Sequence, residues 1–313
     1  MMNLDTTREI AIQEVSTRDG FQIEKRFVET RLKIELINRL SRTGLKRIEV
    51  SSFVSPKAIP NLRDAAEVFA NIDRLPGVTY GALVPNLRGA EAALKARADE
   101  INFVLSVSET HNRANMGMSF DASFAEFERV AGLIKATPTA LNGTIATAFG
   151  CPFEGTQGAS RVLDVAAAYL ACGATSITLA DTTGMAHPLQ IAELCTSFGL
   201  RFKDIPLTLH LHNTRGLGIA NCLAGYSAGV VRFDAALGGL GGCPFAPGAT
   251  GNVCTEDLIH MWQLLGVKHN ADLPALLEIS RDLVAIVGHE LPGQVVRAGP
   301  SWSLHESPAI PKQ

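Results

Sequence analysis

The amino-acid sequence predicts an α/β protein, a (β/α)8 or TIM barrel with additional C-terminal helices. The first reason is an alternation, in which short apolar segments rich in β-forming residues are followed eight times by segments with helical periodicity. The second is the length of 313 residues, which exceeds the roughly 250 residues of a typical barrel and leaves room for extra helices. A doubly wound sheet is the alternative, but no GxGxxG turn follows the first strand.

The individual elements follow from the same periodicities. The expected strands are residues 9–15, 46–50, 78–84, 100–106, 141–148, 174–180, 206–212 and 231–235. The expected helices are residues 30–42, 62–72, 87–97, 119–136, 159–171, 189–198, 217–228, 256–265 and 274–287. The last two lie beyond about residue 255 and would complete or flank the barrel. Because no linker rich in Gly, Pro or Ser interrupts the series, we expect a single domain over residues 1–313.

Composition and charge exclude several classes of protein. The chain has 28 basic and 31 acidic residues, a formal charge of −3 and no Lys/Arg run, so we expect no nucleic-acid partner. It has no apolar stretch of about 18 residues, so we expect no membrane span. The six cysteines form no CxxC pair, and the opening residues lack the pattern of a signal peptide. We therefore expect a cytoplasmic protein with free thiols.

Two histidines end the seventh predicted strand, in Leu207-Thr-Leu-His210-Leu-His212. Residues two apart on a strand point to the same face, so His210 and His212 project together. The carboxyl ends of barrel strands are where such enzymes place their active sites. The pair is suited to sharing one divalent metal ion. The alternative is two buried histidines that contact backbone carbonyls.

The segment Arg18-Asp19-Gly20 follows the first predicted strand and so lies at the same rim. Asp19 offers a hard oxygen ligand, and Arg18 a fixed cation for developing negative charge. Gly20 is expected to allow a sharp turn. The alternative is an ordinary surface ion pair between Arg18 and Asp19.

Glu49 stands between Ile48 and Val50 in the second predicted strand. A carboxylate in an apolar strand is costly unless it is paired. We expect Glu49 to point into the barrel mouth and to pair with Arg18. A structural pair with Lys25 is the alternative.

A glycine-rich loop is expected over residues 237–252, after the eighth strand. So many glycines indicate backbone freedom or a close approach to a ligand. A phosphate cradle is one interpretation, but no GK[ST] follows, which excludes a nucleotide P-loop. Cys243 lies within this loop. A lone cysteine is more often an inert packing residue, but a glycine-rich, partly exposed loop favours reactivity of its thiol.

Taken in order, these segments resemble the 3-hydroxy-3-methylglutaryl-CoA lyase family of the DRE-TIM metallolyases. The resemblance covers roughly residues 9–267. The motifs that carry it are TRDGFQIEK, VSSFVSPKAIP, AFGCPFEG, ADTTGM, HLHNTRGLGIAN and GGLGGCPFAPGATGN. The Claisen synthases of the wider group share the metal site but usually lack the cysteine loop, so this loop favours a lyase.

The resemblance implies a barrel that binds Mg²⁺ or Mn²⁺ and acts on an acyl-CoA. The implied metal ligands are Asp19, His210, His212 and Asn252. The implied catalytic residues are Arg18, Asp19, Glu49, His210 and Cys243. The implied substrate-binding residues are Arg18, Gln22 and Asp181. We also expect a homo-oligomer, either a dimer or a tetramer.

The implied reaction is a retro-Claisen cleavage of 3-hydroxy-3-methylglutaryl-CoA to acetyl-CoA and acetoacetate, as in leucine degradation. His210 is the favoured proton acceptor and Asp19 the alternative, Arg18 stabilises the enolate, and Cys243 returns a proton. The chain departs from the family at Ile23 in FQIE, and at Asn213 and Arg215 in HLHNTRG.

These departures motivate one rival, a lyase for citramalyl-CoA or a longer branched 3-hydroxyacyl-CoA. A Claisen-type acyl synthase is a further alternative. A catalytically silent barrel that acts as a binding or scaffold protein is the third. The sequence disfavours that third reading, because every polar position that the chemistry needs is filled.

Overall fold

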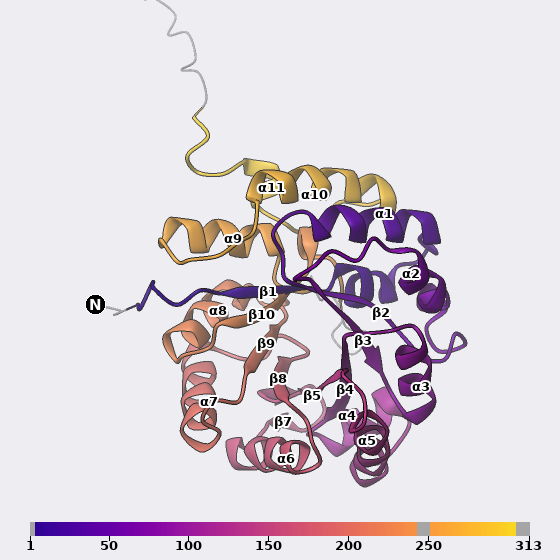
Figure 1. Cartoon of the computed structure of the whole chain (residues 1–313). Helices are drawn as coiled ribbons and strands as arrows, with labels where there is room; N and C mark the ends of the chain where they lie inside the picture. Colours follow the sequence, from indigo (N-terminus) through magenta and orange to yellow (C-terminus); the bar gives the residue numbers. More distant parts are fainter. Residues whose placement is uncertain (1–3, 243–250, 305–313) are drawn as a thin grey trace, which may run out of the picture.

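A closed barrel of eight parallel strands forms the centre of the computed structural model, which describes residues 4–242 and 251–304 (Figure 1). Around the barrel the strands run in the order β1-β10-β9-β8-β5-β4-β3-β2. Their bounds are Ala11–Glu14 (β1), Arg47–Ser52 (β2), Thr79–Val84 (β3), Glu100–Ser106 (β4), Ala140–Ala146 (β5), Ser176–Asp181 (β8), Leu207–Leu211 (β9) and Arg232–Ala235 (β10). The prediction of a (β/α)8 barrel is therefore confirmed.

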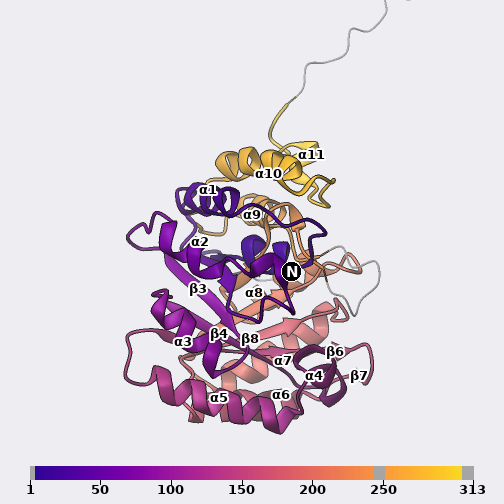
Figure 2. The ribbon, with the colours of Figure 1, turned by 90° about the vertical axis from the view of Figure 1, so that its right-hand side faces the viewer.

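Helices surround this barrel and connect each strand to the next (Figures 1 and 2). They are Thr30–Ser41 (α1), Ala65–Asn71 (α2), Leu87–Lys95 (α3), Glu109–Met116 (α4), Phe120–Ile134 (α5), Ala159–Ala171 (α6), Pro188–Arg201 (α7), Gly218–Ser227 (α8), Thr255–Leu264 (α9), Leu273–Val287 (α10) and Val295–Ala298 (α11). The C-terminal helices α9, α10 and α11 pack against one another, and α10 also lies on α1 (Figure 1). Helices beyond the barrel repeat were expected after about residue 255.

Capping side chains explain where several helices begin. The Ser119 hydroxyl accepts the N–H of Ala122 at 3.2 Å and starts α5, as the sequence predicts. Asn86 caps α3 through the N–H of Gly89 at 3.0 Å, and Asp272 caps α10. Gly288, with φ +76°, ends α10 in the left-handed conformation that favours glycine.

The sequence analysis missed three short elements. Helix α4 has the polar sequence ETHNRANM, which shows no apolar periodicity, although Ser108 caps it through the N–H of His111. A two-stranded hairpin, Gly150–Cys151 (β6) and Gly155–Thr156 (β7), precedes α6. Helix α11 is a single turn. The helix expected over residues 62–72 begins later, because a 3-10 turn at Pro60–Leu62 comes before α2.

The core divides into an apolar outer layer and a polar barrel interior. Apolar side chains fill the space between helices and strands, and Trp262, Tyr80 and Tyr169 are the largest that are fully buried. Within the barrel, polar side chains of neighbouring strands bond to one another, as when Asn142 donates to Thr178 at 3.0 Å. No described helix is long and apolar enough to cross a membrane.

Glu14, the last residue of β1, joins three segments that frame the carboxyl end of the barrel. Its fully buried carboxylate accepts the backbone N–H groups of Ser16 and Leu237, both at 2.9 Å. It also accepts the hydroxyl of Thr255, at the start of α9, at 2.6 Å. One carboxylate therefore fixes the turn after β1, the chain after β10 and the first turn of α9.

We predict that Glu14→Ala lowers the free energy of unfolding by about 3 kcal/mol, because it leaves three buried donors without their acceptor. Urea denaturation measures this loss. Glu193→Ala removes an exposed carboxylate from α7 and serves as the control, with an expected change below about 0.5 kcal/mol. A loss for Glu14→Ala no larger than that of the control would contradict this role.

Candidate active site

The turn that follows β1 carries Arg18 and Asp19 into the mouth of the barrel. Residues Ser16–Gly20 form a single π-helical turn, in which the N–H groups of Arg18, Asp19 and Gly20 all donate to the Val15 carbonyl. The turn is buried throughout, so both charged side chains are held inside the protein. This excludes the alternative of an exposed surface pair.

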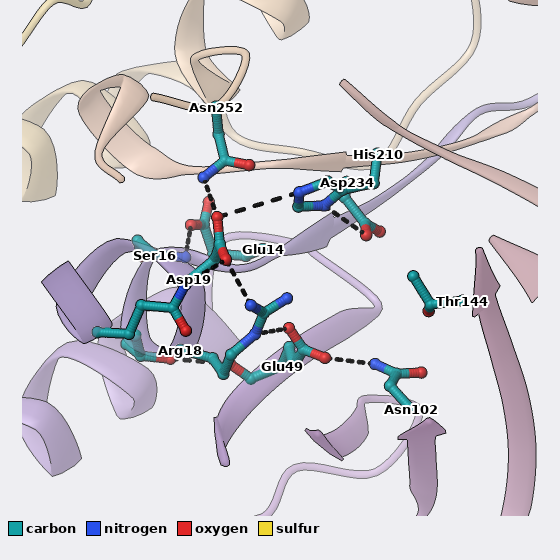
Figure 3. Close-up of polar contacts among 12 residues, drawn as sticks. Glu14, Ser16, Arg18, Asp19, Glu49, Asn102, Thr144, His210, Asp234 and Asn252 are labelled. Carbon is teal, nitrogen blue, oxygen red and sulfur yellow. Dashed lines mark hydrogen bonds and ion pairs between the residues drawn. The ribbon is translucent and has the colours of Figure 1, made fainter. Parts of the chain in front are cut away.

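Arg18 lies between two carboxylates. Its Nε donates to Glu49 Oε2, and its Nη1 donates to Asp19 Oδ1 (Figure 3). Asn102 on β4 donates to the other oxygen of Glu49 at 2.5 Å. The predicted pair of Glu49 with Arg18 is confirmed, and among the described residues Glu49 forms no ion pair with Lys25. Two ion pairs and one amide thus fix the guanidinium in one orientation.

Asp19, His210 and His212 converge beside this arginine. The Nε2 atoms of the two histidines lie 3.2 Å apart, and Asp19 Oδ2 lies 4.0 Å from His210 Nε2 and 3.7 Å from His212 Nε2. Potential ligand atoms of these three buried side chains all lie within 4.8 Å of one another. The histidines do face the same side, as their spacing on β9 predicts. Their described partners are side chains, which argues against the alternative of carbonyl contacts.

Asn252 adds a fourth polar group. An isolated bridge pairs it with His212, and its Nδ2 donates to Asp19 Oδ2 at 2.7 Å (Figure 3). Its buried Oδ1 has no hydrogen-bond partner among the described residues, and neither has Nδ1 of His212. An orphaned buried oxygen beside an aspartate and two imidazoles fits a divalent metal ion, which would give that oxygen a partner.

The charges of the site also fit a dication. Asp19, Glu49 and Asp234 contribute −3 when ionised and Arg18 contributes +1, so the buried group carries −2 with both histidines neutral. Such a concentration of buried negative charge is unfavourable without a counter-ion. One divalent cation would neutralise it.

Electrostatics set the protonation of the ligand candidates. Burial works against the charge of Asp19, but Arg18 and the two histidines outweigh it and lower the pKa of Asp19 to about 2. Burial, aided by His210, lowers the pKa of His212 to about 4. Burial also works against protonation of His210, but the bond to Asp234 and the charge of Asp19 raise its pKa. At neutral pH, Asp19 is an anion and His212 a neutral imidazole, as metal ligation requires.

These side chains line a cavity of about 600 Å³ at the carboxyl ends of the strands. Its lining combines the polar groups described above with apolar side chains such as Ile59, Leu83 and Met116. Helix α4, which the sequence analysis missed, supplies His111, Asn115 and Met116. A cavity of this size with a few convergent polar groups is typical of a small-molecule site.

The other site residues that the sequence predicts are Gln22, Asp181 and Cys243, and they differ in their position relative to the cavity. Gln22 lines the cavity and donates to Asp19 Oδ1 at 3.1 Å. Asp181 ends β8, but both of its oxygens accept backbone N–H groups, from Met185 and Ala186. Burial raises the pKa of Asp181 to about 6, in spite of those bonds. Cys243 lies outside the described residues.

Two glycine interpretations are tested by the backbone. Gly20 ends the tight π-helical turn, but the turn does not need the conformational freedom of glycine there, because the φ of Gly20 is −60°, which any residue adopts. The site needs glycine there for space instead, since a Cβ would lie 2.7 Å from the Leu240 side chain. Gly241 and Gly251 are described residues of the glycine-rich loop. Their φ angles are +119° and +90°, values that favour glycine over other residues. A Cβ on Gly241 would also lie 2.5 Å from Asn252 Nδ2.

Asn213 and Arg215, two departures from the family pattern, do not line the cavity. Asn213 Oδ1 accepts the N–H of Gly218 at the start of α8. Arg215 donates to the carbonyls of Thr183 and Gly184, both at 2.9 Å. Asn213 therefore bonds the first turn of α8 within its own segment, and Arg215 joins this segment to the turn after β8. Ile23, the third departure, does line the cavity.

The sequence analysis missed Asp234 and Asn102, which both line the cavity. Asp234 on β10 bonds His210 Nδ1 through Oδ2 at 3.1 Å, and Asn102 holds Glu49. Each is a polar residue with apolar neighbours on both sides in its strand, Phe233 and Ala235 for Asp234, and Ile101 and Phe103 for Asn102. This is the signal that identified Glu49, and it would have found both.

An ion-paired arginine and a buried Asp-His-His group, at the carboxyl end of a (β/α)8 barrel, define an enzyme with a candidate site for a divalent metal. The family model described as HMGL-like matches residues 9–283. The chain belongs to this family, as the sequence motifs indicate, and it is a carbon–carbon lyase.

Known proteins similar to this chain agree with that assignment. An (R)-citramalyl-CoA lyase of Chloroflexus aurantiacus is 42% identical over 303 residues, covering 94% of this chain and 96% of that protein. A hydroxymethylglutaryl-CoA lyase of Bacillus subtilis is 40% identical over 287 residues, covering 92% and 96%. The solved structure of an HMG-CoA lyase from Acinetobacter baumannii, in complex with coenzyme A and 3-methylmalate, has a TM-score of 0.93 and 51% identity. The alignment covers 98% of this chain and 100% of the chain in that structure.

We predict that saturating Mn²⁺ raises the melting temperature by several degrees, because a ligand at 100 times its Kd stabilises the native state by about 2.7 kcal/mol. His212→Ala removes one nitrogen ligand and should abolish most of this rise. His260→Ala, which removes a histidine that stacks on Trp302, is the control and should keep it. An equal rise in His212→Ala and wild type would place the Mn²⁺ elsewhere.

Proposed function

We propose that the chain cleaves 3-hydroxy-3-methylglutaryl-CoA to acetyl-CoA and acetoacetate, with Mg²⁺ or Mn²⁺ as cofactor. The observation that carries the proposal is the buried group of Asp19, His210 and His212, held beside Arg18 at the floor of the cavity. The similarity to hydroxymethylglutaryl-CoA lyases over nearly the whole chain supports it.

Asp19, His210, His212 and Asn252 would hold the metal ion. When bound, the ion would acidify the tertiary hydroxyl of the substrate and fix its pose. Two oxygen and two nitrogen donors suit either of two metals: Mg²⁺ prefers oxygen, and Mn²⁺ accepts imidazole more readily.

Arg18 is proposed to neutralise the enolate that forms when the carbon–carbon bond breaks. The Nε of Arg18 donates to Glu49 and its Nη1 donates to Asp19. Nη2 is therefore the nitrogen of the guanidinium left for a substrate. Because both carboxylates already hold the side chain, it need not reorganise as the enolate charge develops.

Proton transfer falls to three residues in this proposal. Nδ1 of His210 is hydrogen-bonded to Asp234, so Nε2 is the only ring nitrogen left for another partner. Nε2 cannot bind the metal ion and accept a proton at the same time. His210 is therefore the favoured acceptor of the hydroxyl proton only when its Nε2 is released from the metal ion; Asp19, whose carboxylate keeps further lone pairs when one oxygen is a ligand, is the alternative. Cys243 is proposed from the family resemblance alone to return a proton to the enolate carbon.

(R)-Citramalyl-CoA is the second candidate substrate, because a lyase for it is 42% identical to this chain. It has one methylene fewer between the tertiary carbon and the carboxylate, and its cleavage gives acetyl-CoA and pyruvate. A difference of one methylene is worth about 10- to 200-fold in kcat/KM in a shaped pocket. Assembly as a dimer or tetramer, a cytoplasmic location and a place in leucine degradation remain proposals that the resemblance suggests.

The direct test assays both thioesters with the purified protein and Mg²⁺ or Mn²⁺, measuring acetoacetate and pyruvate separately. We predict at least about tenfold higher kcat/KM for 3-hydroxy-3-methylglutaryl-CoA, and loss of activity in excess chelator. Arg18→Gln should lower turnover by about 100- to 1000-fold. Lys203→Gln, an exposed basic residue beyond α7, is the control and should match wild type.

The other outcomes are decisive too. Preferential release of pyruvate would replace the first candidate with the second. Cleavage of neither thioester, or full activity in excess chelator, would overturn the proposed function.

A further inference from the structure

Asp234 contacts His210 at Nδ1, the ring nitrogen that does not face His212. It lies on β10, directly beside His210 in the parallel register of β10 and β9. Its Oδ2 lies 3.1 Å from His210 Nδ1, and the residue is 5% exposed (Figure 3). The bond therefore joins two buried side chains whose backbones are already fixed by strand pairing.

Oδ1, the other oxygen of the Asp234 carboxylate, does not share this hydrogen bond. Asp234 Oδ1 is buried and has no hydrogen-bond partner among the described residues, although Asp234 lines the cavity. Asp234 also lies close enough to Arg18 and Glu49 to interact electrostatically with both. A buried carboxylate oxygen without a donor is costly, so stability alone does not explain this residue.

Glu100 shows what a structural carboxylate in the same barrel looks like. It lies on β4, farther toward the amino ends of the strands, and pairs with Arg47 of β2. Arg47 in turn also contacts Gln13 at 3.2 Å. Glu100 faces a cation, whereas the hydrogen bond of Asp234 goes to a candidate metal ligand.

We propose that Asp234 is a positioning residue that sets the tautomer and orientation of His210. This inference rests on the proposed metal site. A carboxylate at Nδ1 favours the form in which Nδ1 carries the hydrogen and donates it to Oδ2. The lone pair is then on Nε2, the atom that faces Asp19 and His212. Both uses proposed for His210, ligation and proton acceptance, need that lone pair.

The tautomer is measured without metal or substrate, by nitrogen NMR of protein labelled with ¹⁵N-histidine, with His210→Ala used to assign the signal. At a pH high enough for the His210 ring to be neutral, wild type should show the hydrogen of His210 on Nδ1. Asp234→Ala should lose this preference, and Asp234→Asn should weaken it, while Glu100→Gln should leave it unchanged. An unchanged His210 signal in both Asp234 variants would overturn the proposal.

Mn²⁺ binding, followed by the EPR signal of the free ion, gives the second readout. We expect Asp234→Asn and Asp234→Ala to raise the Kd by about 10- to 100-fold, and Glu100→Gln to keep it. Circular dichroism and thermal melting confirm that each variant is folded; Asp234→Asn changes the side-chain volume least. Unchanged affinity in folded Asp234 variants would overturn the role of Asp234 alone, whereas absence of binding by wild type would overturn the metal site as well.

Discussion

The burial of Asp19 beside Arg18 is the interaction on which the rest of the site depends. Three carboxylates and one guanidinium are enclosed at one end of the barrel, and when all three carboxylates are ionised Arg18 neutralises only one of their charges. A divalent ion at the histidines would balance the remainder. The same charges keep Asp19 ionised and His212 neutral, so the electrostatic need for an ion and the chemistry of its ligands have one origin.

The fold meets this constraint by bringing distant segments to one rim. The turn after β1 supplies Asp19, β9 ends in the two histidines, and the residues that precede α9 supply Asn252. The Glu14 carboxylate links the turn after β1 to the start of α9, because it accepts hydrogen bonds from backbone N–H groups and from the Thr255 hydroxyl. The polar network is therefore rigid on the barrel side, while α4 adds side chains to the cavity wall.

Local patterns were sufficient to predict the barrel, most of its elements, and Arg18, His210 and His212 beside Asp19, whereas Asn252 and Gln22 were named only through the family resemblance. Period-two spacing predicted that His210 and His212 face one side, and an isolated charge in an apolar strand identified Glu49. The same argument applies to Asp234 and Asn102, but their contacts depend on which strands are neighbours. Helix α4 was missed because its polar sequence carries no periodicity. The substrate choice depends on the shape of the cavity, which periodicity does not encode.

Crystals grown with Mn²⁺ test the central claim most directly, because anomalous scattering locates the ion without assuming any ligand. We predict one strong peak bounded by Asp19 Oδ2, the two histidine Nε2 atoms and Asn252 Oδ1. A fully occupied Mn²⁺ site elsewhere, with no density among these four side chains, would contradict it.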